Sequence, residues 1–143
     1  MQYVERQSEV RGRLGIPDTP SSLLDRWRSF VEDCEDGYGW DYSEYSSELR
    51  VRDQLGALLD APELSAFPEH AELARRVGAV DERLRALFLT ERTTDVQQPW
   101  WRAGILKKAA PAYAEYCRKV FSAPVESADL TAGRSNQHDV LEP

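Results

Sequence analysis

The residues best suited to do chemistry lie in one short segment, between positions 32 and 45. This segment holds six carboxylates and four aromatic side chains, and it contains neither Lys nor Arg. The wider stretch 31–60 carries nine acidic and two basic residues, a balance of −7 that equals the net charge of the whole chain. Such a patch attracts a basic protein surface or a hard cation, and it repels nucleic acid and anionic membranes.

The aromatic residues give this segment the composition of a protein interface. Tyr and Trp anchor interfaces, and surrounding carboxylates speed and orient the approach of a basic partner. We expect Trp40 and Tyr45 to close the end of the helical core, because large aromatic side chains dominate cores. The residues expected to contact a basic partner are Asp33, Glu35, Asp36, Tyr38, Asp41, Tyr42 and Glu44.

A small acidic helical protein with tyrosines and carboxylates on one edge is similar in physical type to nuclease-toxin immunity proteins. The similarity is one of composition, because no family motif aligns residue by residue. It implies that the protein neutralises a basic partner by binding it, with no chemistry of its own. An immunity-like or inhibitor-type role is therefore one form of the protein-binding hypothesis.

The same segment also has the outline of a calcium-binding EF-hand loop. With Asp33 at loop position 1, Glu35, Asp41 and Glu44 fall at positions 3, 9 and 12, which supplies four oxygen ligands. Tyr38 then falls at position 6, where the sharp turn requires glycine. A divalent-cation site at Asp33, Glu35, Asp41 and Glu44 is therefore the weaker interpretation, and we expect no cofactor.

A second candidate binding feature is the adjacent pair Trp100 and Trp101. Arg102 follows directly, and Lys107 and Lys108 follow a few residues later, so an aromatic slot here would have a basic rim for a carboxylate or phosphate. Packing of the indoles against a neighbouring helix is the simpler interpretation. The alternative function is small-molecule binding, or a modest enzyme activity, in a pocket near Trp100, Trp101 and Arg102.

Sequence motifs of known catalytic chemistry are missing. The two histidines, His70 and His138, are too few for a His-based triad or a His-rich metal site. A P-loop, a dinucleotide fingerprint and a paired-cysteine metal motif are also absent. We therefore expect a binding protein rather than an enzyme, and the lack of a basic stripe predicts that it does not bind nucleic acid.

Composition favours a protein of the bacterial cytoplasm. Arg outnumbers Lys fifteen to three, as is typical of GC-rich coding sequences. We expect no secretory signal peptide, no membrane span and no membrane partner, because long apolar runs are missing. In a reducing compartment Cys34 and Cys117 should be buried free thiols. A disulfide between them stays an open alternative that requires close approach of their backbones.

Apolar spacing predicts an all-α compact bundle that presents these segments. Its four main helices are expected at about 22–34, 43–60, 69–90 and 111–121, with a short tryptophan-containing segment before the last. The clearest apolar stripe follows a 4-3-4-3 spacing and consists of Leu73, Val77, Val80, Leu84 and Leu87. In the last helix the expected inner stripe is Tyr113, Cys117, Val120 and Phe121.

The two ends of the chain have weaker patterns. Residues 1–20 mix charges with Gly and Pro and are expected to form an irregular or partly helical lead-in, followed by Ser21 or Ser22 as a helix N-cap. Residues 122–143 contain few apolar side chains and are expected to form a flexible tail. The single helical domain would cover residues 1–121, and the oligomeric state stays open.

Two charge pairs are expected on helix surfaces. Glu48 and Arg52 are four residues apart, which places their side chains beside each other on the solvent side of a helix. Arg85 lies one turn after Asp81 and is the nearest partner for that carboxylate. Both pairs are predictions from local spacing alone.

Overall fold

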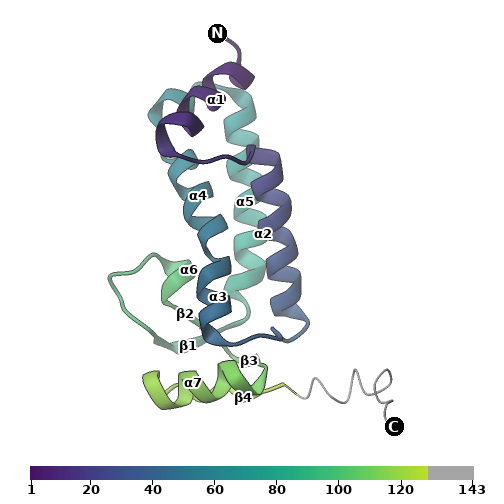
Figure 1. Ribbon diagram of the computed structural model, residues 1–143, viewed down its shortest axis with the longest axis vertical. Coiled ribbons are helices and arrows are strands. Elements are labelled where there is room, and N and C mark those ends of the chain that lie inside the picture. Colours follow the sequence, from purple (N-terminus) through teal and green to yellow (C-terminus); the bar gives the residue numbers. More distant parts are fainter. Residues whose placement is uncertain (129–143) are drawn as a thin grey trace.

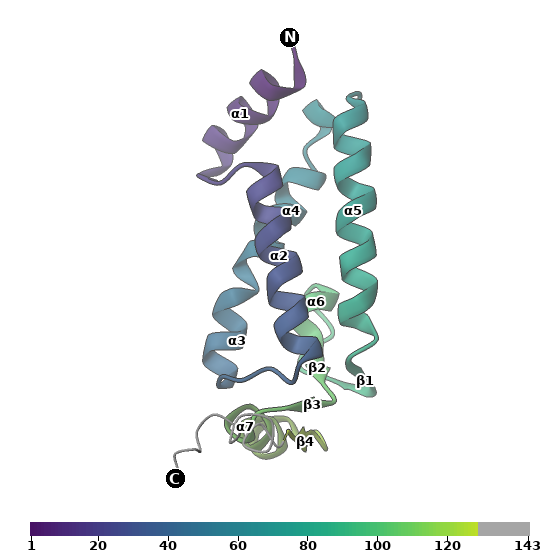
Figure 2. The ribbon, with the colours of Figure 1, turned by 90° about the vertical axis from the view of Figure 1, so that its right-hand side faces the viewer.

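The computed structural model describes residues 1–128 of the 143-residue chain (Figure 1). Its helices are α1 (Tyr3–Leu14), α2 (Pro20–Glu35), α3 (Tyr42–Glu48), α4 (Arg50–Leu59), α5 (Pro68–Arg85), α6 (Trp100–Ala103) and α7 (Pro111–Phe121), with a 3₁₀ turn η1 at Pro62–Leu64. In Figures 1 and 2, α2, α4 and α5 run along the long axis of the molecule, and α7 lies across one end. The prediction of a mostly helical compact fold is confirmed.

Helix α2 begins with a threonine cap and a proline. Thr19 Oγ1 accepts a hydrogen bond from the backbone N–H of Ser22 at 3.1 Å, and Pro20 occupies the first turn. The helix therefore begins two residues earlier than predicted, and neither Ser21 nor Ser22 caps it. Its inward face consists of the apolar residues that helical spacing indicated: Leu23, Leu24, Trp27, Phe30, Val31 and Cys34.

The predicted helix 43–60 is divided into α3 and α4 at Leu49. Asp41 caps α3, because its Oδ1 accepts a hydrogen bond from the backbone N–H of Glu44 at 2.8 Å. At the division, the backbone N–H groups of Arg52 and Asp53 both donate to the Leu49 carbonyl, at 2.9 and 3.2 Å. The first of these is a tight i,i+3 bond, so the chain takes one 3₁₀-type turn where periodicity indicated a continuous α-helix.

Helix α5 ends at Arg85, five residues before the predicted end. Leu73, Val77, Val80 and Leu84 are buried as their spacing predicted, whereas Leu87 lies beyond the helix and is partly exposed. The chain continues instead into strand β1 (Phe88–Thr93), whose first residues overlap the predicted helix 69–90.

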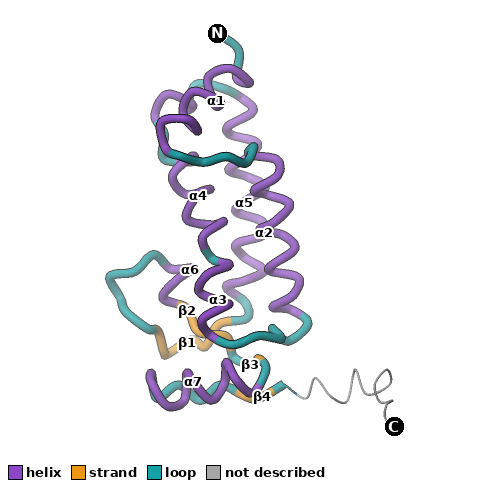
Figure 3. Tube along the Cα trace, in the orientation of Figure 1, coloured by secondary structure: helices purple, strands orange, loops and turns teal. Residues whose placement is uncertain are grey.

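Four short strands join the bundle to α7, although no strand was predicted. Strand β1 pairs antiparallel with β2 (Gly104–Leu106), and β3 (Lys108–Ala109) pairs in parallel with β4 (Glu126–Ser127). Figure 3 places these strands at the end of the molecule near α7. Strands β2, β3 and β4 have only two or three residues, which is too short for a period-two pattern, and the six residues of β1 do not alternate apolar and polar side chains.

Helix α7 is confirmed at Pro111–Phe121, but its stripe and its continuation differ from the prediction. Tyr113 and Cys117 are fully buried, whereas Val120 is 51% exposed. The predicted tail does not begin at Ser122, because the next residues return along β3 and pack against it. Glu126 N–H donates to the Lys107 carbonyl at 2.8 Å. Residues 129–143 of the predicted tail lie outside the described residues.

The N-terminal part of the chain forms helix α1, Tyr3–Leu14, which packs against the core. Val10 of α1 and Ile16 after it are buried at 2% and 5% exposure, so this part is more regular than the lead-in that was expected. Helix α1 contacts η1 and α4 at the end of the bundle opposite α7. Its N-terminus is stabilised by a capping box between Gln2 and Glu5.

A buried ion pair joins α4 to α5. Arg52 Nε and Nη2 donate to the two carboxylate oxygens of Asp81 at 3.0 and 2.9 Å. The Trp27 indole N–H of α2 donates to the same carboxylate at 3.0 Å. The predicted partners were wrong: Glu48 accepts a hydrogen bond from the Tyr38 hydroxyl, and Arg85 pairs with Glu82.

Cys34 and Cys117 are both buried free thiols, as the sequence analysis predicted. Within residues 1–128, no helix combines the length and apolar character that crossing a membrane requires.

Candidate functional site: an acidic corner and an adjoining polar groove

The acidic segment lies where α2 passes into α3, at the end of the bundle near α7 (Figure 1). Asp33, Asp36, Asp41 and Glu44 are all exposed there. Among the side chains that the structure describes, which within residues 1–128 are all but that of Arg92, no ion pair includes any of the four. We call these four carboxylates together with Trp40 the acidic corner.

Neighbouring carboxylates in and beside the acidic corner act on the ionisation of Asp33. Partial burial raises the pKa of the Asp33 carboxyl, and the neighbouring charges of Asp36 and Glu32 raise that pKa further. Like charges that oppose each other's ionisation lie close enough to repel. A basic group that approaches this corner would relieve that repulsion.

Glu35, which the sequence grouped with these acids, is already paired within the chain. Its carboxylate oxygens accept hydrogen bonds from Arg83 Nε and Nη2 of α5 at 2.9 and 2.7 Å. This contact lowers the pKa of the Glu35 carboxyl. Glu35 therefore belongs to an α2–α5 surface contact and offers less free charge than its neighbours.

Tyr38 and Trp40 have exchanged the positions that were expected of them. Tyr38 is fully buried, and its ring packs edge-on against Tyr45 at a centroid distance of 5.3 Å. Burial and the hydrogen bond to Glu48 raise the pKa of the Tyr38 hydroxyl. Trp40 is 65% exposed, whereas Tyr45 is buried as expected. The exposed aromatic side chain of the acidic corner is therefore Trp40.

Tyr42 links the acidic corner to α7. Its ring stacks on that of Tyr116 with a centroid distance of 4.9 Å and an interplanar angle of 14°. Burial raises the pKa of the Tyr42 hydroxyl to about 12; Cys117 and Tyr116 add to the shift, and the nearby Arg102 cation opposes it. Tyr42 is half-buried, so only part of its ring is available to a partner.

The cation-site hypothesis depends on whether the loop gathers its carboxylates. Within residues 1–128, no group of three or more His, Cys, Asp or Glu side chains has an arrangement that could hold a metal ion. Asp33, Glu35, Asp41 and Glu44 are accordingly not brought together as ligands. Glu35 bonds to Arg83, and Asp41 caps α3.

The tryptophan pair is held by charged side chains of the bundle. The Trp101 indole N–H donates to Asp53 Oδ1 at 2.7 Å, and the Arg52 guanidinium lies 4.1 Å from the Trp101 ring centroid. The Arg85 guanidinium lies 4.0 Å from the ring centroid of Trp100. Both indoles are partly buried, and their faces have cation partners from within the chain.

Arg102 does not form a common pocket with these two tryptophans. Its Nε donates to Asp53 Oδ1 and Oδ2 at 3.1 and 3.0 Å, and its Nη2 forms an ion pair with Asp53 Oδ2 at 2.6 Å. A hollow of about 400 Å³ borders Trp100, and neither Trp101 nor Arg102 lines it. Lys107 and Lys108, the expected basic rim, line a different hollow beside Cys34.

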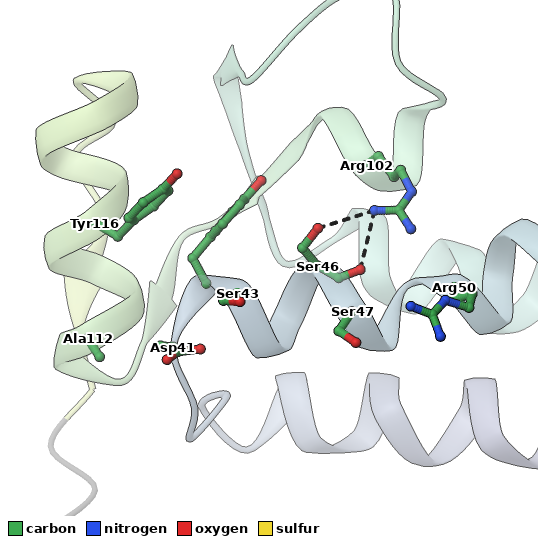
Figure 4. Close-up of a pocket in the computed structure, with 9 residues that line it drawn as sticks. Asp41, Ser43, Ser46, Ser47, Arg50, Arg102, Ala112 and Tyr116 are labelled. Carbon is green, nitrogen blue, oxygen red and sulfur yellow. Dashed lines mark hydrogen bonds between the residues drawn. The ribbon is translucent and has the colours of Figure 1, made fainter.

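Arg102 instead borders an open groove of about 620 Å³ between α3 and α7 (Figure 4). One side of the groove is formed by α7, through Ala112 and Tyr116. In Figure 4, Asp41 lies on the side of the group nearest α7, and Arg50 lies at the end furthest from α7. The residues that line the groove are Asp41, Tyr42, Ser43, Ser46, Ser47, Arg50, Arg102, Ala112 and Tyr116.

Most of this groove was missed from the sequence, although a signal for it exists. Ser43, Ser46, Ser47 and Arg50 follow the i, i+3, i+4, i+7 spacing of one helix face. A polar stripe of this kind ordinarily indicates a solvated face, so the pattern alone did not single it out. The contribution of Tyr116 depends on how α7 docks, which no local pattern reports.

Comparison of the chain with protein-family models, with curated proteins and with solved structures finds no match.

Proposed function

We propose that this protein binds a basic protein surface through the acidic corner, with Trp40 as the anchoring side chain. The observation that carries the proposal is the 65% exposure of Trp40 among four carboxylates that have no ion-pair partner among the described side chains. An exposed indole with unpaired charges around it is the composition of an interface hot spot. The mechanism is association without chemistry.

The acidic corner affects both the rate at which a basic partner associates and the rate at which it dissociates. Unpaired carboxylates create a negative local field, which accelerates the encounter with a basic partner and weakens as salt screens it. Burial of the Trp40 indole on contact removes a large apolar area from water, which slows dissociation. An inhibitor-type role follows where the basic surface covered by the corner is the working surface of the partner.

The alternative of a ligand pocket near Trp100, Trp101 and Arg102 has less geometric support. Cations from within the chain occupy the faces of both indoles, and Arg102 is committed to Asp53. The hydrogen-bond donors that remain available to a small ligand lie in the groove between α3 and α7.

A neutralising variant tests the proposal without disturbing the fold. Asn is as good a helix cap as Asp, so the Asp41 cap survives the change to Asn. The four substitutions are Asp33→Asn, Asp36→Asn, Asp41→Asn and Glu44→Gln, and they change the net charge from −7 to −3, since −7 + 4 = −3. A control with the same net charge carries changes at four exposed acids elsewhere: Glu9→Gln, Asp60→Asn, Glu69→Gln and Glu91→Gln.

The measurement is affinity capture from a lysate of the native cells at low and high salt, followed by the Kd of the purified captured protein. We expect wild type and the control variant to hold a basic protein at low salt, and the corner variant to lose it. Trp40→Ala should weaken the same complex by about tenfold or more, whereas Val96→Ala, at a side chain with 88% exposure, should leave it unchanged. Equal loss in the corner and control variants, or an affinity independent of salt, would refute the proposal.

A further inference from the structure

We infer that the groove between α3 and α7 is a binding site for a small anionic ligand, a carboxylate or a phosphate, held at its Arg50 end. The inference is independent of the proposed protein partner, because the acidic corner and this groove share only Asp41. The groove's volume of about 620 Å³ lies within the range of small-molecule sites. Of the three residues in the predicted tryptophan pocket, only Arg102 lines this groove.

The groove is rich in hydrogen-bond donors that have no acceptor. Among the described side chains of residues 1–128, which exclude that of Arg92, the hydroxyls of Ser43 and Ser47 form no hydrogen bond, and the Arg50 side chain forms neither a hydrogen bond nor an ion pair. An arginine carries five N–H donors and no acceptor. Three serine hydroxyls and a free guanidinium on one face therefore offer donors that an anion accepts.

Arg102 adds a preorganised second cation. Its Nε and Nη2 are fixed by Asp53, which holds the guanidinium in one orientation. Its Nη1 donates to both the carbonyl and the hydroxyl oxygen of Ser46, at 3.3 Å each. These bonds are long, so an anion that accepts a hydrogen bond from Nη1 costs little to accommodate. Because the Ser46 oxygen is the acceptor, the hydroxyl proton of Ser46 is free to donate to the same ligand.

Charge within the groove differs between the side near α7 and the far end. Asp53 compensates Arg102, which leaves the Asp41 carboxylate on the side nearest α7 and the Arg50 guanidinium at the end furthest from α7 (Figure 4). An anion therefore prefers the Arg50 end, beside Ser46 and Ser47. The stacked rings of Tyr42 and Tyr116 form an aromatic wall for any organic part of the ligand.

The test is a titration of the uniformly ¹⁵N-labelled full chain, followed by backbone chemical shifts, with four probes. Phenyl phosphate and benzoate carry both an anion and a ring, inorganic phosphate carries the anion alone, and phenol carries the ring alone. We expect saturable shifts at Ser46, Ser47 and Arg50 with the three anions and none with phenol. Tighter binding of phenyl phosphate than of phosphate assigns the organic part to the tyrosine wall, and equal binding assigns the site to the anion alone.

Two matched variants test whether Arg50 contributes to anion affinity. Arg50→Gln removes an exposed, unpaired guanidinium, so the fold should persist while anion affinity falls by about tenfold, as loss of a charged hydrogen bond predicts. Lys107→Gln removes the same charge outside the groove and should leave affinity unchanged. Shifts that stay linear in anion concentration, or equal weakening in the Arg50→Gln and Lys107→Gln variants, would show only general charge attraction and overturn the inference.

Discussion

Arg52 and Asp81 face each other with two parallel hydrogen bonds, Nε to Oδ1 at 3.0 Å and Nη2 to Oδ2 at 2.9 Å, in the interior between α4 and α5. Their side chains are only 7% and 10% exposed. Trp27 of α2 donates to the same carboxylate, so one charge joins three helices. The Arg52 guanidinium also lies 4.1 Å from the ring centroid of Trp101. Trp101 directly precedes Arg102, which lines the groove.

Removing the Asp81 charge should strongly destabilise the fold. Asp81→Asn leaves Arg52 charged and uncompensated in the interior, which we expect to cost about 3 kcal/mol of unfolding free energy. Arg52→Met combined with Asp81→Asn should cost less than Asp81→Asn alone, because no unpaired charge remains. Urea denaturation measures both variants beside wild type, with Glu82→Gln as an exposed control expected to change stability by less than about 0.5 kcal/mol. A double variant that loses as much stability as Asp81→Asn, or more, would contradict this account.

Gly104 is required by the ring of Phe88. A Cβ at position 104 would overlap with that ring in the β1–β2 pair, so Gly104→Ala should destabilise the protein by about 1–3 kcal/mol. Gly12, in the last turn of α1, has no atom within 4 Å of its ideal Cβ. Gly12→Ala should therefore stabilise by about 0.5–1 kcal/mol, since alanine favours helix. Thermal unfolding of the two variants should move Tm in opposite directions, and shifts of the same sign would refute the geometry.

The Tyr42 hydroxyl predicts a loss of stability at alkaline pH. Burial first, then Cys117 and Tyr116, raise the pKa of Tyr42 from 10.0 to about 12, against the opposing Arg102 cation. The unfolded chain therefore loses this proton first, so the stabilising contribution is fully present below pH 10 and is lost as pH rises toward 12. Tyr42→Phe should reduce the fall of the urea midpoint across this window. An identical fall in wild type and Tyr42→Phe would show that Tyr42 does not contribute.

Both thiols should resist alkylation in the folded protein. Burial raises the pKa of Cys117 to about 11, with the Tyr113 hydrogen bond opposing it, and burial also raises the pKa of Cys34. The reactive thiolate is therefore scarce at neutral pH, and access is blocked. Mass spectrometry after iodoacetamide treatment should show slow modification of native protein and rapid modification of urea-unfolded protein. Comparable rates in the two states would indicate that a thiol is exposed.

Helix α5 and the beginning of α3 were readable from the sequence because their signals are local. Leu73, Val77 and Leu84 repeat at helical spacing, and the face that they define is buried. Asp41 could be recognised as a cap because its hydrogen bond spans three residues. Thr19 was missed because the serines after Pro20 offered a second plausible cap.

The candidate site was only partly readable, since exposure depends on contacts far along the chain. The sequence located the acidic segment, but the alternation of aromatic and acidic residues there does not say which ring turns inward. Tyr38 is buried because Phe30, Tyr45 and Tyr113 of three separate helices surround it, which leaves Trp40 outside. The groove depends on α7 docking beside α3, which brings Tyr116 to Tyr42 across 74 positions of sequence, since 116 − 42 = 74.

The sequence by itself determined the helical class, the acidic charge near the α2–α3 connection, and the apolar faces that seek a core. Each follows from residue type and from spacing within one or two turns. Only the tertiary structure decided that Arg52, and not Arg85, neutralises Asp81, because the partner of a buried carboxylate is set by which helices pack together. The short strands and the groove arise in the same way, from segments whose neighbours in space are distant in the chain.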